Sequence, residues 1–131
     1  MNQSPSFDEA AAVLKALSDP NRLRILDVLM EGTSCNCELT ERLGLPANLL
    51  SHHLRVLRKA GLVFSRRDAI DGRWIYYTVD QEAVARWQDW FAAFLDPSRI
   101  RERQLCGPEG QQTVGEISLI FKPDCIPGTD Q

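Results

Sequence analysis

The chain has 131 residues, of which 44% are hydrophobic and 25% charged, and its formal net charge is −3. This is the composition of an ordinary globular protein, and the length predicts one domain with its own core. No window approaches the roughly 18 consecutive apolar residues of a membrane span. The first residues also lack the basic and apolar regions of a signal peptide. We therefore expect a cytoplasmic protein.

The basic residues are concentrated in one segment. Between His52 and Arg73, six basic residues and two aspartates give a local balance of +4, and subtracting this from −3 leaves −7 for the rest. A basic sector on an acidic body suits the phosphates of a nucleic acid. The alternative is a solvated basic face without a partner.

Two helices are predicted before residue 32. Ser6 and Glu9 have the spacing of a capping box at the start of a helix over about residues 7–17. Asp19 can cap a second helix, the proline that follows fits its first turn, and Gly32 can end it.

The next two predicted helices are close together. "CELTERLGLP" predicts a short third helix ended by Gly44, and "ANLLSHHLRVLRKAGLV" predicts a fourth that begins after Pro46 and ends near Gly61. Two short helices joined by a glycine-containing turn are typical of a helix-turn-helix.

The fourth helix has two different faces. Leu50, Leu54 and Leu57 fall on one side, with His53 beside them. The opposite side is polar and basic: Asn48, Ser51, His52, Arg55, Arg58 and Lys59. Such a helix suits a DNA major groove, where side chains contact base edges and phosphates together. A surface helix with ordinary solvated charges has the same spacing, so this alternative stays open.

A β-hairpin is predicted next. Two β-rich runs, Val63–Asp68 and Trp74–Val79, are separated by "AIDG", in which Asp-Gly is a strong turn signal. Arg66, Arg67 and Arg73 make its stems and tip basic, so the hairpin is predicted to be a wing that lies along the DNA backbone.

A fifth helix is predicted over "QEAVARWQDWFAAFLD", ended by Pro97. Its apolar stripe is strongly aromatic and predicts a dimer interface; it consists of Val84, Trp87, Trp90, Phe91 and Phe94. We therefore predict a mainly α-helical domain over residues 1–96. The C-terminal extension, residues 97–131, is predicted to be partly ordered, with one strand around Ile117, Leu119 and Phe121.

The order of these elements and four segments of sequence resemble the ArsR/SmtB family of metal-sensing repressors. The segments are "LKALSDPNRLRILDVL", "CNCELTERLGL", "LLSHHLRVLRKAGLV" and "RRDAIDGRWIYYTVD". The resemblance implies a homodimeric winged helix-turn-helix repressor that blocks transcription until an inducer binds, and the dimer and helix-turn-helix geometry predict palindromic half-sites. An enzyme is not expected, because the sequence suggests no phosphate loop, no pair of catalytic carboxylates and no nucleophile beside a base. It implies DNA contacts by Asn48, Ser51, His52 and Arg55, supported by the wing arginines. Pro46 and Ala47 stand where the family often has Ser and Gln, so a side-chain cap is lost.

The resemblance also indicates where an inducer binds. The zinc-type site on the last helix needs histidine, and the fifth helix contains none. The arsenic-responsive site is a Cys-x-Cys, matched here by Cys35 and Cys37, with Thr40 where a third cysteine is often found. As(III) and Sb(III) prefer three thiolates. Cys106 or Cys125 could complete the site, or a solvent or small-thiol ligand could.

Helix geometry limits how the cysteine pair can bind one ion. Residues two apart on a helix point about 200° apart. Both sulfurs can meet only if the first turn is unwound or Cys35 lies outside the helix. A helix N-terminus is expected to lower the pKa of a thiol. A disulfide framework is not expected in a cytoplasmic chain, so the four cysteines are predicted to be reduced thiols, metal ligands or redox sensors. Sensing of Cd(II), Pb(II) or Cu(I), or a redox or persulfide switch, remains an alternative function of the same fold.

Overall fold

The computed structural model of the protein describes residues 3–110. The chain divides into two compact units, Met1–Phe94 and Leu95–Gln131. Within the described residues, no helix is both long enough and apolar enough to cross a bilayer.

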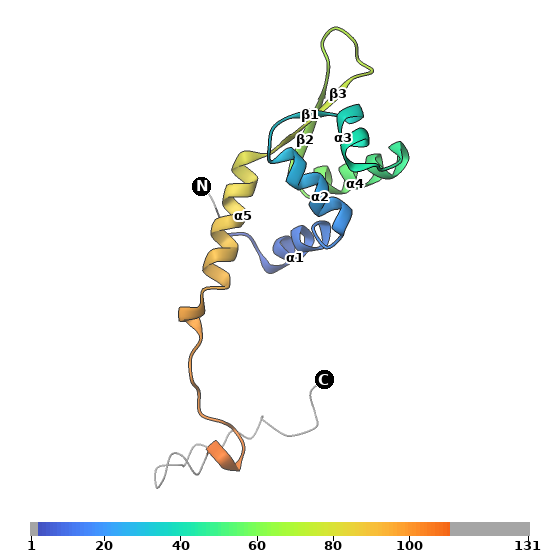
Figure 1. Ribbon diagram of the computed structural model, residues 1–131. Coiled ribbons are helices and arrows are strands. Elements are labelled where there is room, and N and C mark those ends of the chain that lie inside the picture. Colours follow the sequence, from blue (N-terminus) through green and yellow to red (C-terminus); the bar gives the residue numbers. More distant parts are fainter. Residues whose placement is uncertain (1–2, 111–131) are drawn as a thin grey trace. The chain divides into compact units, whose positions relative to one another are not determined.

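The described part of the first unit contains the five predicted helices (Figure 1). They are α1 (Phe7–Ala16), α2 (Pro20–Leu29), α3 (Asn36–Leu43), α4 (Ala47–Lys59) and α5 (Gln81–Phe94). Three of the predicted capping signals are confirmed, whereas α2 ends at Leu29 with Met30 as its C-cap residue, before the predicted Gly32. Ser6 and Glu9 form a reciprocal capping box on α1, and the Asp19 side chain accepts from two backbone nitrogens of α2. Gly44 ends α3 in the left-handed conformation, with φ of 66°, which glycine adopts without steric cost.

Three strands form one antiparallel sheet in the order β1-β3-β2. The predicted hairpin is confirmed as β2 (Val63–Arg67) and β3 (Ile75–Val79), each one residue shorter than predicted. The third strand, β1 (Ser34–Cys35), was not predicted. Two residues are too few to show the alternating pattern of a strand in the sequence. Strand β1 forms because it pairs with the edge of β3, where Cys35 lies opposite Tyr76.

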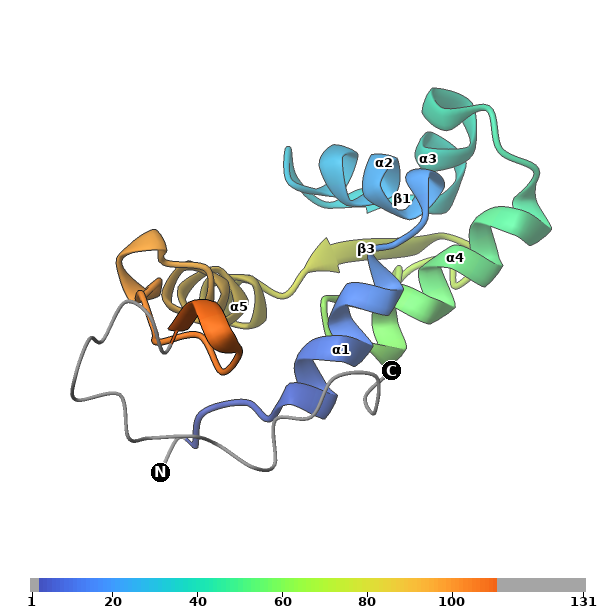
Figure 2. The same cartoon turned by 90° about the horizontal axis from the view of Figure 1, so that it is seen from below.

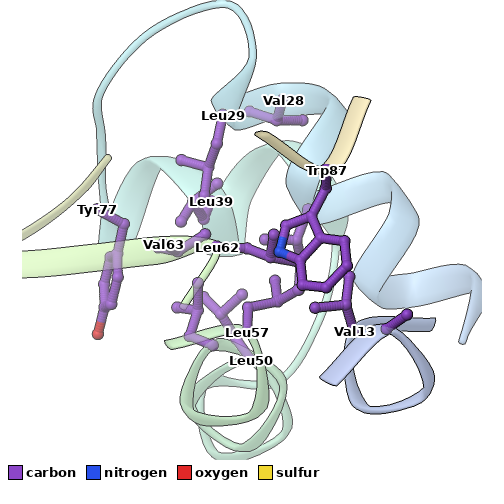
Figure 3. Packing of buried hydrophobic residues seen from close by; sticks show 13 residues of the cluster. Val13, Val28, Leu29, Leu39, Leu50, Leu57, Leu62, Val63, Tyr77 and Trp87 are labelled. Carbon is purple, nitrogen blue, oxygen red and sulfur yellow. The ribbon is translucent and has the colours of Figure 1, made fainter. Parts of the chain in front are cut away.

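The core lies where the first four helices and the hairpin meet, and α5 adds one aromatic side chain to it. Ile25, Leu39, Leu54 and Leu57 are its fully buried residues. Figure 3 shows the Trp87 side chain of α5 directed into this cluster, beside leucines and valines from the other elements. Seen from below in Figure 2, α4 lies against the strands, with α2 and α3 on their other side. Helix α4 therefore has one face fixed by the core.

The second unit has little regular structure among its described residues. Pro97–Arg99 forms a short 3₁₀ helix that begins with Asp96, whose side chain accepts from the Ser98 backbone nitrogen at 2.9 Å. The strand predicted around Ile117, Leu119 and Phe121 lies outside the described residues.

Candidate nucleic-acid interface and inducer site

Helix α4 separates its two faces as its sequence predicts. Leu50, His53, Leu54 and Leu57 are buried. The predicted DNA-contacting side chains of this helix are all exposed: Asn48, Ser51, His52, Arg55, Arg58 and Lys59. Pro46 is the N-cap residue, and no side chain caps the helix, as predicted. The backbone nitrogens of the first turn are therefore available to an acceptor on a partner.

Three of these cations share one open hollow. Arg55, Arg58 and Lys59 line it together with Val63, Phe64 and Ser65 of β2, and its volume is about 640 Å³. The hollow lies between the C-terminal end of α4 and β2, the first strand of the hairpin. A concentration of cations at this junction suits the phosphates of a nucleic-acid backbone.

The wing arginines are exposed, but each is held by a neighbour. Arg66 lies over the Tyr76 ring, with its guanidinium carbon 4.8 Å from the ring centre. Arg67 donates to the Gly72 carbonyl at 2.6 Å. Arg73 forms a two-pronged ion pair with Asp71, at 3.1 Å and 2.8 Å, which raises the pKa of Arg73 and lowers that of Asp71. Contacts within the hairpin thus orient the basic side chains.

The two cysteines before α3 bring their sulfurs together. Cys35 lies outside the helix, as the N-cap residue, with φ of −84° and ψ of 162°. Cys37 lies in the first turn, and the two Sγ atoms are 3.7 Å apart. The two sulfurs therefore meet because Cys35 lies outside the helix, which is one of the two arrangements predicted, and the first turn of α3 is not unwound. Both thiols are free, and both are at least partly accessible.

Cys35 has two structural roles besides its place in this pair. Its Sγ accepts from the Glu38 backbone nitrogen at 3.4 Å, and its backbone nitrogen donates to the Glu38 carboxylate at 3.2 Å. This is a capping box in which a sulfur replaces the usual hydroxyl oxygen. Cys35 is also a residue of β1, paired with Tyr76 in the wing strand β3. One side chain therefore contributes both to the start of α3 and to the edge of the wing.

The expected lowering of a thiol pKa is wrong for Cys37. Its thiol shares a hydrogen bond with Cys35, and this bond, with burial second, raises the pKa of Cys37. This hydrogen bond favours the protonated thiol of Cys37 and outweighs the effect of the helix N-terminus. A ligand that binds both sulfurs must therefore displace a proton from Cys37.

The structure supplies no third thiolate from α3. Thr40 donates its hydroxyl hydrogen to the Asn36 carbonyl at 2.9 Å. Among residues 3–110, no group of three or more His, Cys, Asp or Glu side chains is arranged to hold a metal ion. Cys106 is disulfide-bonded, so the expectation of a free thiol is wrong for this residue. Cys125 lies outside the described residues.

His53 is buried in the interior of the domain, whereas the neighbouring His52 is exposed. It is only 5% exposed, and its Nδ1 is 3.0 Å from Nη1 of Arg22. Arg22 also donates through Nε to the Ala16 carbonyl at 2.6 Å. Burial, assisted by the charge of Arg22, lowers the pKa of His53. A neutral His53 thus accepts from Arg22 and connects α4 to α1 and α2. His52 is exposed on the predicted DNA face.

The aromatic side chains of α5 are divided between the core and the surface. Trp87 is only 6% exposed, so it has little area left for a partner, whereas Phe94 is 42% exposed. Trp90 stacks on Phe94 with ring centres 5.0 Å apart, and Phe7 of α1 packs edge-on against both rings. Phe7 is itself 72% exposed. The surface of this aromatic cluster therefore comes from both α1 and α5, and the apolar stripe of α5 alone does not predict the contribution of Phe7.

Comparison with known proteins agrees with this geometry. Residues 19–65 match the model of the family described as "Bacterial regulatory protein, arsR family". The HTH-type transcriptional regulator MJ1325 of Methanocaldococcus jannaschii is 43% identical over 76 residues, which are 56% of this chain and 82% of that protein. The arsenic resistance transcriptional regulator ArsR1 of Pseudomonas putida is 42% identical over 78 residues, which are 59% of this chain but only 58% of that protein.

A solved structure has the same architecture. The winged helix-turn-helix DNA-binding domain Mb0332 from Mycobacterium bovis, described as homodimeric and as a possible ArsR-family regulator, superposes with a TM-score of 0.56. It is 30% identical, and the match covers 74% of this chain and 89% of that one. Members of this family regulate transcription and are not enzymes. The chain belongs to the arsR family of bacterial regulatory proteins and has its winged helix-turn-helix fold.

Proposed function

We propose that the protein is a homodimeric repressor that binds palindromic operator DNA and releases it when As(III) or Sb(III) binds Cys35 and Cys37. The observation that carries the proposal is the 3.7 Å separation of the two sulfurs at the start of α3, the helix that braces α4. Similarity to the arsenic resistance regulator ArsR1 supports the choice of inducer.

The polar face of α4 enters the major groove. Asn48, Ser51 and His52 contact base edges and Arg55 contacts base or phosphate, while Arg58 and Lys59 bind phosphates beside the hollow at β2. The wing arginines contact the flanking backbone. In the dimer, two α4 helices reach half-sites about one helical turn apart. Similarity to the homodimeric Mb0332 domain supports this assembly.

The dimer interface is formed by the aromatic cluster of α1 and α5. Val84, Trp90, Phe91 and Phe94 supply the contact on α5, and Trp87 supports them from the core. A stacked pair of large rings, of which Phe94 is 42% exposed, is costly to leave in water and favours a second copy of the same surface.

The cysteine pair meets the distance requirement of a soft ion. Bonds of about 2.3 Å from each sulfur require the sulfurs to lie within about 4.6 Å of each other, and 3.7 Å satisfies this limit. The bound ion supplies a soft Lewis acid that takes electron pairs from thiolates. Its third ligand is Cys125, Cys106 after reduction, or a small thiol from solution.

Inducer binding acts on DNA affinity through Cys35. A lone pair of this sulfur that caps Glu38 would instead bind the ion, so the start of α3 loses its cap. Loss of an N-cap costs about 0.5–2 kcal/mol, which is comparable to typical allosteric coupling of about 1–3 kcal/mol. Because Cys35 also pairs with Tyr76, the same event disturbs the wing.

Single Cys→Ser variants test the proposal in an operator-binding assay with As(III). Cys35→Ser and Cys37→Ser are expected to bind operator as the wild type does but to keep it bound when arsenite is added. Serine is close to cysteine in size, and at position 35 its hydroxyl oxygen can cap α3 in place of the sulfur. Normal release by both variants would refute the proposal.

Two further variants examine the third ligand. Cys106→Ser and Cys125→Ser, tested under reducing conditions, respond normally if a small thiol completes the site, and one of them responds weakly if its sulfur does. Thr40→Cys adds a thiol three residues after Cys37, on the same helix face. It is expected to lower the arsenite concentration needed for release. Cd(II) and peroxide in parallel arms test the alternative inducers, and release by peroxide without arsenite would overturn the metalloid assignment.

A further inference from the structure

One row of side chains crosses the sheet and begins at the cysteine pair. In the strand order β1-β3-β2, Cys35 lies opposite Tyr76, and Tyr76 lies opposite Arg66. Residues directly opposite each other on neighbouring strands have their side chains on the same face, close enough to interact. Tyr76 therefore lies between a proposed inducer ligand on one side and a basic residue of the hairpin on the other.

The Tyr76 side chain makes two contacts within the hairpin. The guanidinium of Arg66 lies over its ring, with the central carbon 4.8 Å from the ring centre. Its hydroxyl donates to the Asp68 carboxylate at 2.5 Å, a distance typical of a strong hydrogen bond to a charged acceptor. This hydroxyl is also the main cause that lowers the pKa of Asp68, so the acceptor is ionised at neutral pH. Tyr76 thus orients one cation and one carboxylate of the hairpin.

Asp68 in turn fixes the connection between the two hairpin strands. Its other carboxylate oxygen accepts from the backbone nitrogens of Ile70 and Asp71, at 2.8 Å and 3.0 Å. This connection extends away from the rest of the first unit, with β1 and α3 near the base of the hairpin (Figure 1). A change at Tyr76 therefore reaches the far end of the hairpin through one carboxylate.

In the proposed function, inducer binding acts on this row at Cys35. Strand β1 has only two residues, so few hydrogen bonds hold it to β3, and a displaced Cys35 alters the pairing with Tyr76. The next residue, Asn36, accepts from the Ile75 backbone nitrogen at 3.3 Å, so the start of α3 contacts β3 at two adjacent residues. A hydrogen bond weakens steeply when its distance or angle changes. Movement at the start of α3 therefore weakens the contact between Tyr76 and Asp68.

We propose that Tyr76 is a positioning residue that couples inducer binding at Cys35 to the hairpin through its hydroxyl contact with Asp68. This inference rests on the proposed function, because it requires that the inducer releases operator DNA. Without inducer, the contact holds the hairpin in the conformation that binds DNA. With inducer, the contact is lost, and the hairpin must be ordered again when DNA binds. In this role Tyr76 binds neither the inducer nor the DNA.

The first test compares Tyr76→Phe with the wild type on a duplex that the wild type selects from a random pool. Phenylalanine keeps the ring beneath Arg66 and removes only the hydroxyl. Without arsenite, the variant should bind operator about 5-fold more weakly, which is the effect of ordering a side chain on binding. At saturating arsenite the two proteins should bind operator equally, because the contact is already lost in the wild type.

The ratio of the two operator affinities separates coupling from a merely structural effect. A damaged hairpin would lower the affinity by the same factor with and without arsenite, so an unchanged ratio in Tyr76→Phe would overturn the inference. Arsenite should bind Tyr76→Phe at least as tightly as the wild type in the absence of DNA, because no contact with Asp68 has to be broken. The coupling is reciprocal, so both measurements report the same loss.

Tyr77→Phe is the matched control, because it removes the same hydroxyl from the next residue of β3. Tyr77 lies on the opposite face of the sheet, is 7% exposed and belongs to the core cluster (Figure 3). Its ratio of operator affinities should equal that of the wild type. Asp68→Asn provides a second background, in which Tyr76→Phe should lower the operator affinity little further. A full additional loss there would show that the two residues act separately and would also refute the relay.

The second test follows the contact itself by NMR. The chain has only two tyrosines, so Tyr77→Phe labelled with ¹³C at tyrosine Cζ gives one signal, from Tyr76. This carbon carries the hydroxyl, and its chemical shift therefore reports the hydrogen bond to Asp68. Saturating arsenite should move the signal toward its position in the Asp68→Asn form of the same protein, and Cys35→Ser should prevent the movement. A signal that arsenite does not move would contradict the proposal.

Three outcomes separate this inference from the proposed function. A wild type that keeps its operator at saturating arsenite refutes both. A wild type that releases its operator, together with a Tyr76→Phe variant of equal affinity ratio, refutes only the role of Tyr76. Weaker arsenite binding by Tyr76→Phe would assign the residue to the inducer site and would also refute its positioning role.

Discussion

Arg22 is expected to be a principal stabilising residue of the first unit, and Arg22→Met tests this. Its guanidinium donates to the Ala16 carbonyl and to Nδ1 of His53, so one side chain connects α1, α2 and α4. A hydrogen bond from a charged donor contributes about 1.5–3 kcal/mol. Two such bonds set an upper range of about 3–6 kcal/mol. Because Arg22 is half-buried and water can reach part of the gap, we expect a loss of about 2–4 kcal/mol.

The assay is urea unfolding at fixed protein concentration, since a dimer gains apparent stability with concentration. With a slope of about 2 kcal/mol per molar urea, the midpoint should fall by about 1–2 M. Arg24→Met is the matched control, because Arg24 lies on the same helix and donates only to the Asn21 side chain at an exposed site. Its loss should stay within about 0.5 kcal/mol. Equal losses in the two variants would refute the reasoning.

Four further predictions concern pH, core packing, the dimer interface and backbone conformation. The buried His53 has a lowered pKa, so the unfolded chain takes up the proton first. The free energy of unfolding should therefore be highest above pH 6.5 and should decrease as the pH falls below that value. The decrease should be smaller in His53→Gln, and urea titrations between pH 5 and 8 measure it in both proteins. Trp87→Ala is expected to cost about 3–5 kcal/mol in thermal unfolding, because the indole fills the core. Phe94→Ala should instead raise the dimer dissociation constant about tenfold in sedimentation experiments, with little change in unfolding of the monomer; the opposite pattern would exchange the roles of the two residues. Gly44→Ala should lower stability by about 1 kcal/mol or more in calorimetry, because the residue has φ of 66° and space for a methyl group does not relieve the backbone strain.

Much of the fold could be predicted because its signals are local. The helices follow from apolar residues at helical spacing together with Ser6, Asp19 and Gly44 at their ends. The hairpin follows from two β-rich runs around Asp71 and the glycine after it. Each of these features depends on neighbours within a few residues, so the order of residues contains the information.

The faces of α4 could be predicted for the same reason, but the position of Trp87 could not. A period of 3.6 residues separates the buried leucines from the exposed donors and cations of α4. On α5 the periodicity identifies an aromatic stripe but not which element covers it. The structure divides that stripe, with Trp87 in the core and Phe94 accessible beside Phe7, because α1 approaches α5 from far away in the sequence.

The sequence by itself determined the helices, the wing and the cysteine pair, since each depends on spacing along the chain. Only the tertiary structure decided how the pair is arranged. The edge of β3 makes Cys35 a strand residue opposite Tyr76, and this keeps its sulfur outside α3 and 3.7 Å from that of Cys37. The local signal was the glutamate three residues after Cys35, which has capping-box spacing. The strand was not foreseeable, because its partner lies some forty residues away, and pairing over that distance depends on the folded core and not on local preference.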